Sequence, residues 1–349
     1  GLNHSFFANS GSEANDTNIR IVRHFWRSRG FVDKTVIISR KNAYHGSTIG
    51  GASLGGMEPM HSQGDLPIRN IVHINQPDWW SEGKQLTPFE FGILCAKELE
   101  DLILEYGENR VAAFIAEPIQ GAGGVIVPPD SYWPEIQKIC NKYNILLIVD
   151  EVICGFGRTG NWFGSQTLNI EPDIITVAKG LSSGYLPIGG SIVTDEIAEV
   201  LGETEFNHGY TYSGHPVAAA VALENLRILE EEHIIENVRQ LTSPYLKSKW
   251  ESLSEHPLVG EAKIVGMMAS IALTPNQKTR EKFKCEDGAA GVMCREHCYA
   301  SNLIMRAVGD RMIISPPLII SCEEIDILYN RVTLALDKTY DELKVKNLI

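Results

Sequence analysis

The stretch Ile145-Leu-Leu-Ile-Val-Asp150-Glu151 decides the fold of the chain. Its consecutive apolar residues end in two acids, a pattern typical of a parallel strand that is covered on both faces. Comparable apolar runs are found at 35–39, 111–117, 174–178 and 189–193, and helical patterns lie between them at 13–29, 87–106 and 132–143. This alternation predicts a doubly wound α/β domain with a mostly parallel central sheet flanked by helices.

The pattern changes after Pro216. Two long helical patterns cover 216–232 and 235–254, and a strand-like segment at 263–273 follows. The remainder predicts a helix at 288–300, short strands at 303–306 and 311–314, and a final helix from Ser321. We therefore expect a large domain over residues 1–230 and a smaller α+β domain over residues 231–349.

Composition narrows the class of protein. The chain has 349 residues, a formal net charge of −13 and seven cysteines. The negative charge argues against nucleic acid and anionic membranes as partners. Free thiols, with no signal peptide and no long apolar run, predict a cytoplasmic protein. The spacing of Cys294, His297 and Cys298 matches no common zinc motif, so we predict no metal site.

Two charged side chains stand at the ends of separate predicted strands. Lys179 follows the run Asp173-Ile-Ile-Thr-Val-Ala, and Asp150 ends the run quoted above. The carboxyl ends of strands in open α/β sheets border the ligand crevice. There a lysine serves as an amine nucleophile, and a carboxylate keeps a pyridine nitrogen protonated. Together the two residues indicate a pyridoxal 5′-phosphate (PLP) site.

The remaining parts of such a site are also present. The turn Ser10-Gly11-Ser12 opens a predicted helix, and the first N–H groups of a helix bind anions such as phosphate. Tyr44 follows a predicted strand, where its ring could stack on a flat cofactor. Either motif alone is also what an ordinary capped helix or a core aromatic residue would give.

Several motifs in this order resemble the class III aminotransferases of PLP fold type I. They are Asn9-Ser-Gly-Ser-Glu-Ala-Asn-Asp-Thr17, Tyr44-His-Gly-Ser-Thr48, Ala116-Glu-Pro-Ile-Gln-Gly121, Val149-Asp-Glu-Val152, Ala178-Lys-Gly180 and Thr211-Tyr-Ser-Gly-His-Pro216. They extend over nearly the whole chain. The resemblance implies a PLP-dependent transferase of amino groups in which Lys179 carries the cofactor as a Schiff base and Asp150 assists it.

The resemblance also implies a role for each matching position. Ser10, Gly11 and Ser12 would hold the phosphate, Tyr44 would stack on the ring with His45 beside it, and Val152 would pack on the opposite face. Glu117 would orient the surroundings of the cofactor and Asp150. Thr211 would reach the phosphate in a neighbouring subunit, which implies a homodimer or a tetramer built from dimers.

Further motifs, including Gly155-Phe-Gly-Arg-Thr-Gly160 and Ile304-Met-Arg-Ala-Val-Gly-Asp310, resemble the amine:pyruvate branch, above all its putrescine:pyruvate enzymes. The resemblance implies transfer from a putrescine-like or ω-amino donor to pyruvate, with Arg306 and Tyr44 binding substrate. A planar guanidinium suits a carboxylate. A β-alanine:pyruvate enzyme is the alternative substrate class.

Two features of the sequence also fit other interpretations. The run Gly155–Gly160 matches the glycine pattern of dinucleotide-binding enzymes, but residues 161–164 do not have the helical pattern that this motif requires. The chain also starts close to the phosphate turn, whereas members of the family carry a substantial segment before it. A catalytically incomplete PLP-fold binding protein is therefore the alternative of another class.

Overall fold

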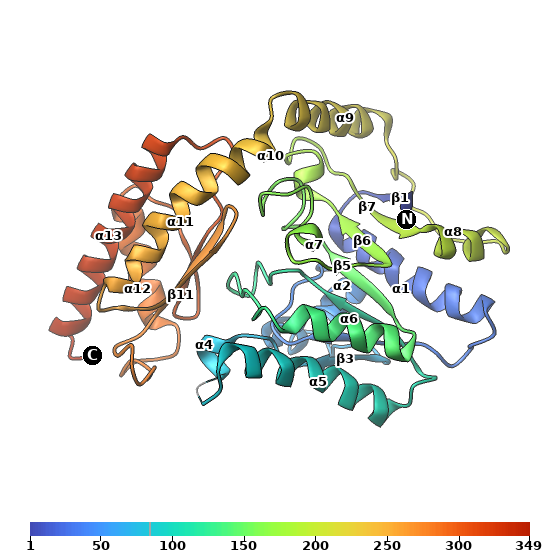
Figure 1. Cartoon of the computed structure of the whole chain (residues 1–349), viewed down its shortest axis with the longest axis horizontal. Coiled ribbons are helices and arrows are strands. Elements are labelled where there is room, and N and C mark those ends of the chain that lie inside the picture. The colour runs from blue at the N-terminus through green and yellow to red at the C-terminus, as the bar shows by residue number, and fades with distance from the viewer. Residues whose placement is uncertain (84) are drawn as a thin grey trace.

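Two β-sheets organise the chain, one of seven strands and one of four. The computed structural model describes residues 1–83 and 85–349. Figure 1 shows the larger sheet with its helices in one domain and the smaller sheet beside it in a second, with α9 above the larger domain. The predicted boundary after residue 230 stays a prediction.

The larger sheet has the order β1-β7-β6-β5-β4-β2-β3. Its strands are β1 (Leu2–Ala8), β2 (Val36–Arg40), β3 (Ile71–Ile74), β4 (Val111–Ala116), β5 (Leu146–Asp150), β6 (Ile174–Val177) and β7 (Gly189–Thr194). Only β7 runs antiparallel to its neighbours. Six strands thus share one direction, so their carboxyl ends meet at one edge, where ligands bind in such sheets.

Helices cover both faces of this sheet. The helices of the chain are α1 (Gly11–Ser28), α2 (Ile49–Leu54), α3 (Glu58–His61), α4 (Trp79–Glu82), α5 (Pro88–Tyr106), α6 (Tyr132–Tyr143), α7 (Gly164–Thr167), α8 (Asp195–Gly202), α9 (Pro216–Glu231), α10 (Ile234–Asn237), α11 (Ser243–Ser252), α12 (Ala289–Ala300) and α13 (Cys322–Val345). Side chains of α1 and α8 pack on one face and those of α5 and α6 on the other. The predicted three-layer α/β domain is confirmed.

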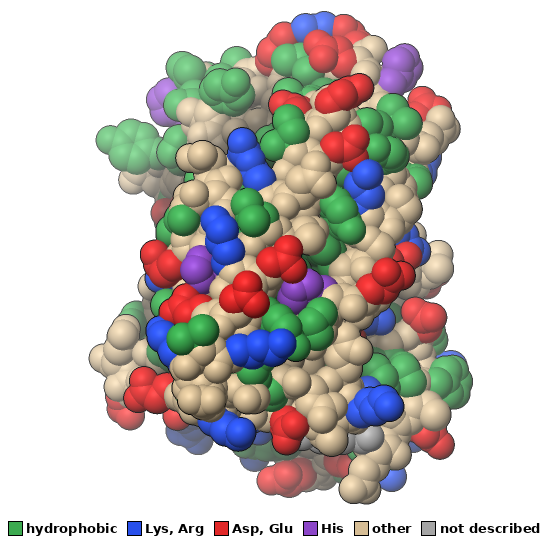
Figure 2. Space-filling view, turned by 90° about the vertical axis from the view of Figure 1, so that its left-hand side faces the viewer, with side chains coloured by type: hydrophobic (Ala, Val, Ile, Leu, Met, Phe, Trp, Pro, Cys, Tyr) green, Lys and Arg blue, Asp and Glu red, His purple; other side chains and the backbone are tan. Residues whose placement is uncertain are grey.

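The smaller sheet is antiparallel throughout and has the order β10-β11-β9-β8. Its strands are β8 (Val259–Val265), β9 (Met268–Leu273), β10 (Arg306–Val308) and β11 (Arg311–Ile314). One face packs against α11, α12 and α13, whereas Met268 and Ile313 on the other face contact the larger domain. Figure 2 shows the outer side of this domain, where acidic, basic and apolar side chains are mixed.

Three details of the C-terminal region differ from the sequence prediction. The helix expected over 235–254 is divided by a π-helical turn at Val238–Thr242, because Pro244 has no N–H to donate and its ring displaces a preceding carbonyl. The strand expected at 303–306 lies at Arg306–Val308, where the turn at Gly309 fixes its pairing with β11. The single segment expected at 263–273 is the β8–β9 hairpin.

Candidate active site

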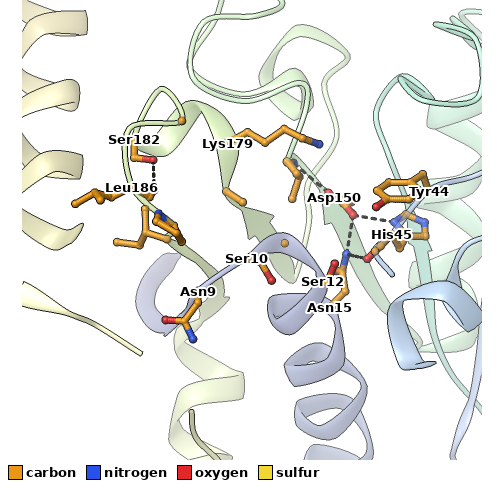
Figure 3. Close-up of a pocket in the computed structure, with 17 residues that line it drawn as sticks. Asn9, Ser10, Ser12, Asn15, Tyr44, His45, Asp150, Lys179, Ser182 and Leu186 are labelled. Atoms are coloured by element: carbon orange, nitrogen blue, oxygen red, sulfur yellow. Dashed lines mark hydrogen bonds and ion pairs between the residues drawn. The ribbon is translucent and has the colours of Figure 1, made fainter. Parts of the chain in front are cut away.

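A cavity of about 370 Å³ opens at the carboxyl edge of the larger sheet. We call it the first cavity. Most of the predicted cofactor residues line it, namely Ser10, Gly11, Ser12, Tyr44, His45, Asp150, Val152 and Lys179. They come from the start of α1 and from the segments after β2, β5 and β6 (Figure 3). Parallel strands and their shared edge bring these distant residues together.

Asp150 is the best-supported side chain of the first cavity. Its Oδ2 accepts hydrogen bonds from Asn15 Nδ2 and His45 Nδ1, each at 2.8 Å, and its Oδ1 accepts from the Val152 backbone N–H at 3.0 Å. Asp150 is only 3% exposed. Three donors on one buried carboxylate stabilise its negative charge and fix its orientation (Figure 3).

His45 forms a pair with Asp150 that is shielded from water. Its Nδ1 faces the carboxylate, whereas its Nε2 is buried and has no partner among the described residues. The ring thus helps to fix the orientation of the Asp150 carboxylate.

Asn15 was not predicted from the sequence, and its side chain hydrogen-bonds to both members of this pair. Its Nδ2 also donates to the backbone oxygen of His45 at 2.8 Å, and its Oδ1 accepts from the Thr176 hydroxyl at 2.9 Å. Asn18 Nδ2 donates to Thr176 Oγ1 at 2.8 Å. Asn15 and Asn18 lie one turn apart on the buried face of α1. Two amides among the mostly apolar buried residues of this helix were the available signal.

The start of α1 forms the end of the first cavity at which an anion would bind. Ser10 caps the helix, since its hydroxyl oxygen accepts from the Glu13 N–H at 3.2 Å. The opening N–H groups of an α-helix have no partner within the helix and attract anions. A Cβ at Gly11 would lie 2.9 Å from Val152 Cγ2, so only glycine leaves this wall undisturbed.

Lys179 stands between β6 and the first cavity in a strained conformation. Its φ of +40° lies in the left-handed region, which non-glycine residues rarely occupy. Such strain persists where the surrounding structure enforces it, and it is frequent at functional sites. Lys179 is exposed and not buried, because a second cavity opens on its other side.

Glu117 connects Tyr44 with the chain turn that begins at Gly121. Its carboxylate accepts from the Tyr44 N–H at 3.1 Å and from the Gly121 N–H at 2.8 Å. Burial raises the pKa of Glu117, an effect that His45 and Arg40 oppose and Asp150 reinforces. Glu117 therefore fixes the backbone of two parts of the site wall, and the orienting role toward the cofactor stays a prediction.

The second cavity has a volume of about 480 Å³ and shares Lys179 and Tyr44 with the first. Its walls come from both domains. They include Gly121, Ala122, Val125 and Ile153 from the larger domain, and Arg306, Ile313 and Ser315 from the smaller one. The structure thus places the predicted substrate residue Arg306 in a largely apolar cavity that meets the cofactor residues at Lys179.

Thr211 is the one predicted cofactor residue that lies apart. It occupies an exposed turn and is not among the described residues that line either cavity. The resemblance assigned it to a neighbouring subunit, and that role stays a prediction.

The structure also bears on the glycine motif, on metal binding and on membrane spans. Residues 155–160 form turns and do not open a helix, as a dinucleotide site would require. Over residues 1–83 and 85–349, no group of three or more His, Cys, Asp or Glu side chains is arranged to hold a metal ion. No helix in the same ranges is long and apolar enough to cross a membrane.

The fold and the site define a class of enzyme. An amine and a buried carboxylate at neighbouring strand ends, beside a helix N-terminus, are the arrangement of the fold type I enzymes that use PLP. The family model for class III aminotransferases matches residues 1–336. The chain belongs to this family and is an aminotransferase.

Individual relatives of the chain are also named as aminotransferases or transaminases. A putrescine–pyruvate aminotransferase of Pseudomonas aeruginosa is 61% identical over 97% of this chain and 74% of its own length. A chloroplastic gamma aminobutyrate transaminase of Solanum lycopersicum is 43% identical over 99% of this chain and 68% of its own. The solved omega transaminase of Pseudomonas jessenii in complex with PMP has a TM-score of 0.95 at 41% identity, covering 98% of this chain and 76% of that one.

The first cavity fits the PLP that this family uses. A phosphate has the helix start at Gly11 and Ser12, and the Ser12 hydroxyl oxygen already accepts from the Ser47 N–H at 3.1 Å, which leaves its own hydrogen free to donate. A protonated pyridine nitrogen suits the carboxylate of Asp150. Tyr44 and Val152 offer an aromatic and an apolar surface within the same cavity.

Proposed function

We propose that this chain binds PLP in the first cavity and transfers an amino group from a putrescine-like or ω-amino donor to pyruvate, giving an aldehyde and alanine. The observation that supports this most is the meeting of the two cavities at Lys179. A cofactor on one side and a substrate on the other would both be in reach of one amine. The names of the relatives support the substrate class.

Each residue of the first cavity has its own proposed role in the reaction. When bound, PLP withdraws electrons from the substrate carbon that loses its proton. Asp150, held by Asn15 and His45, keeps a negative charge against the ring nitrogen. Lys179 would hold the resting cofactor through its amine, and the same amine, once free, would take the proton from the substrate carbon. Tyr44 and Val152 would restrain the ring of the bound cofactor.

The lining of the second cavity supports pyruvate as the acceptor. Its walls are mostly apolar, and Arg306 is the single charged residue other than Lys179 among the described residues that line it. A guanidinium binds the pyruvate carboxylate in two parallel hydrogen bonds. The same geometry would hold the carboxylate of β-alanine or γ-aminobutyrate, which keeps an ω-amino acid donor as the second candidate.

A donor panel distinguishes the two candidates. We expect PLP-loaded protein with putrescine and pyruvate to form alanine, and Arg306→Gln to raise the KM for pyruvate by about ten-fold while changing the KM for putrescine little, because putrescine has no carboxylate. For an ω-amino acid enzyme, β-alanine would have the higher kcat/KM, and the variant would raise its KM as well. Failure of every donor to yield alanine would contradict the proposal.

We propose further that the active protein is a homodimer or a tetramer built from two dimers, with Thr211 near the cofactor phosphate of the adjacent subunit. The exposed turn of Thr211 continues into α9 and carries large apolar side chains in solvent, including Tyr212 at 71% and Leu223 at 68% exposure. Exposed apolar patches mark interfaces. Sedimentation velocity should show no monomer at micromolar concentration, and a monomer would contradict this part.

A further inference from the structure

A buried ion triad joins the two domains beside the second cavity. Arg311 on β11 binds Asp78 of the larger domain through Nη2, at 3.0 Å to Oδ1 and 3.1 Å to Oδ2. Its Nη1 lies 3.2 Å from Glu261 Oε2 on β8. Asp78 and Arg311 are 6% and 8% exposed. Sequence reasoning gave none of these three residues a role.

The triad lies in a closely packed contact between the domains. Arg280 stacks on Trp79 and Trp80, which follow Asp78, and it donates to their backbone oxygens at 3.3 and 3.2 Å. The ring of Trp80 in turn covers Gly260, next to Glu261, so closely that no Cβ would fit there. The segment after β3 is therefore fixed to the smaller sheet at several points.

Strand register places Arg306 on the same face as Arg311. In the β10–β11 pair, Arg306 is directly opposite Ile313, and opposite residues project to one face. Arg311 lies two residues before Ile313 and so projects to that face as well. Met312 and Ile314 point the other way, into the core of the smaller domain. The triad thus anchors the sheet face that presents Arg306 to the second cavity.

The opposite wall of the second cavity is attached to the same triad. Arg311 Nη1 lies 3.4 Å from Ser270 Oγ, and Ser270 donates to the Val125 backbone oxygen at 3.3 Å. Val125 has a φ of +51°, which is costly for a β-branched residue. A Cβ on the adjacent Gly124 would lie 3.0 Å from Arg311 Cδ. Arg311 therefore supports both the Arg306 strand and the strained turn across from it.

We propose that Arg311 is a positioning residue that, held by Asp78 and Glu261, sets the place of Arg306 in the second cavity and thereby the enzyme's affinity for a carboxylate acceptor. A buried ion group is a poor source of stability compared with apolar residues of the same volume. The planar guanidinium is nevertheless fixed in orientation, because Nη2 donates to Asp78 and Nη1 donates to Glu261. This inference rests on the proposed function, because Arg306 must be the group that binds pyruvate.

The test uses the full chain loaded with PLP and the variant Arg311→Lys, which keeps the charge and loses the fork. We expect the KM for pyruvate to rise about ten-fold, since small misplacements of a binding group have large kinetic effects. The putrescine half-reaction, followed without pyruvate by the cofactor absorbance, should stay within about two-fold. Arg331→Lys, at a site where Arg331 donates to the Asn302 backbone oxygen on an exposed surface, is the matched control and should change neither.

A double-mutant cycle distinguishes a failure of the proposed function from a failure of the positioning role of Arg311. In an Arg306→Gln background, Arg311→Lys should no longer raise the KM for pyruvate, because it acts through Arg306. If Arg306→Gln itself leaves that KM unchanged, the proposed function is wrong about Arg306. If Arg306→Gln raises it and Arg311→Lys does not, or if the two effects simply add, the positioning role is overturned.

A second variant covers the case in which Arg311→Lys does not fold. Asp78→Glu keeps the charge of both partners but moves the carboxylate by one methylene relative to Arg311. Like Arg311→Lys, it should raise the KM for pyruvate. Thermal unfolding followed by circular dichroism shows whether each variant is folded. A folded Asp78→Glu protein with unchanged kinetics for both substrates would overturn the inference.

Discussion

Replacing Lys179 by alanine should abolish transamination while the protein stays folded. We expect kcat to fall on the order of 10⁴-fold or more, since the variant lacks both the amine that attaches the cofactor and the base that moves the proton. The visible absorbance of the PLP–protein adduct should disappear as well. Because the Lys179 side chain is exposed, its loss removes no buried contact, and the protein without cofactor should stay folded.

The matched control for this substitution is Lys282→Ala. The Lys282 side chain is 78% exposed and pairs only with Asp287 among the described residues, in a domain that does not hold the cofactor cavity. It should keep both the rate and the absorbance. If Lys179→Ala turned over at the wild-type rate, the assignment of the site would be wrong.

Replacing Asp150 by asparagine should have the second-largest effect. The side chain keeps its shape, so its oxygen can still accept from Asn15 and His45, but the negative charge is lost. We expect kcat to fall on the order of 10³-fold, the scale seen when one preorganised electrostatic group is removed from an active site. Steady-state kinetics and the absorbance of bound PLP measure the two properties, and PLP should still bind.

Asp173→Asn is the matched control for Asp150→Asn. Asp173 precedes β6, which pairs with the strand β5 that ends in Asp150. The Oδ2 of Asp173 accepts a hydrogen bond from the Leu147 N–H at 2.7 Å. Burial raises the pKa of Asp173, but the residue stands at the far end of the strands from the first cavity. Equal losses in both variants would point to a structural effect and contradict the role given to Asp150.

Much of the fold could be predicted because short-range patterns determine it. The bounds of α6 were predicted to the residue, since an amphipathic helix leaves a periodic pattern. The strand β5 lies within the apolar run that predicted it, one residue shorter at each end. The π-helical turn before Pro244 and the shifted β10 were not predicted. They depend on how one proline and one glycine turn are accommodated in the assembled domain.

The candidate site, like the fold, was predicted only in part. Lys179 and Asp150 could be placed together because parallel strands end at one edge. Asn15 was missed because its partners, His45 and Asp150, are 30 and 135 residues away. The pairing of Arg311 with Asp78 spans 233 residues, and no local pattern records it. The contacts of Asn15 arise from the packing of α1 on the larger sheet, and the pairing of Arg311 with Asp78 arises from the relative placement of the two domains.

The most direct measurement is to find which lysine carries the cofactor. The PLP-loaded protein would be reduced with borohydride, which makes the bond between cofactor and lysine permanent, then digested and mapped by mass spectrometry. We predict the phosphopyridoxyl mass on the peptide that contains Lys179, and on Lys179 itself by fragmentation. A modified lysine elsewhere, or an unmodified Lys179 in protein that binds PLP, would contradict the account.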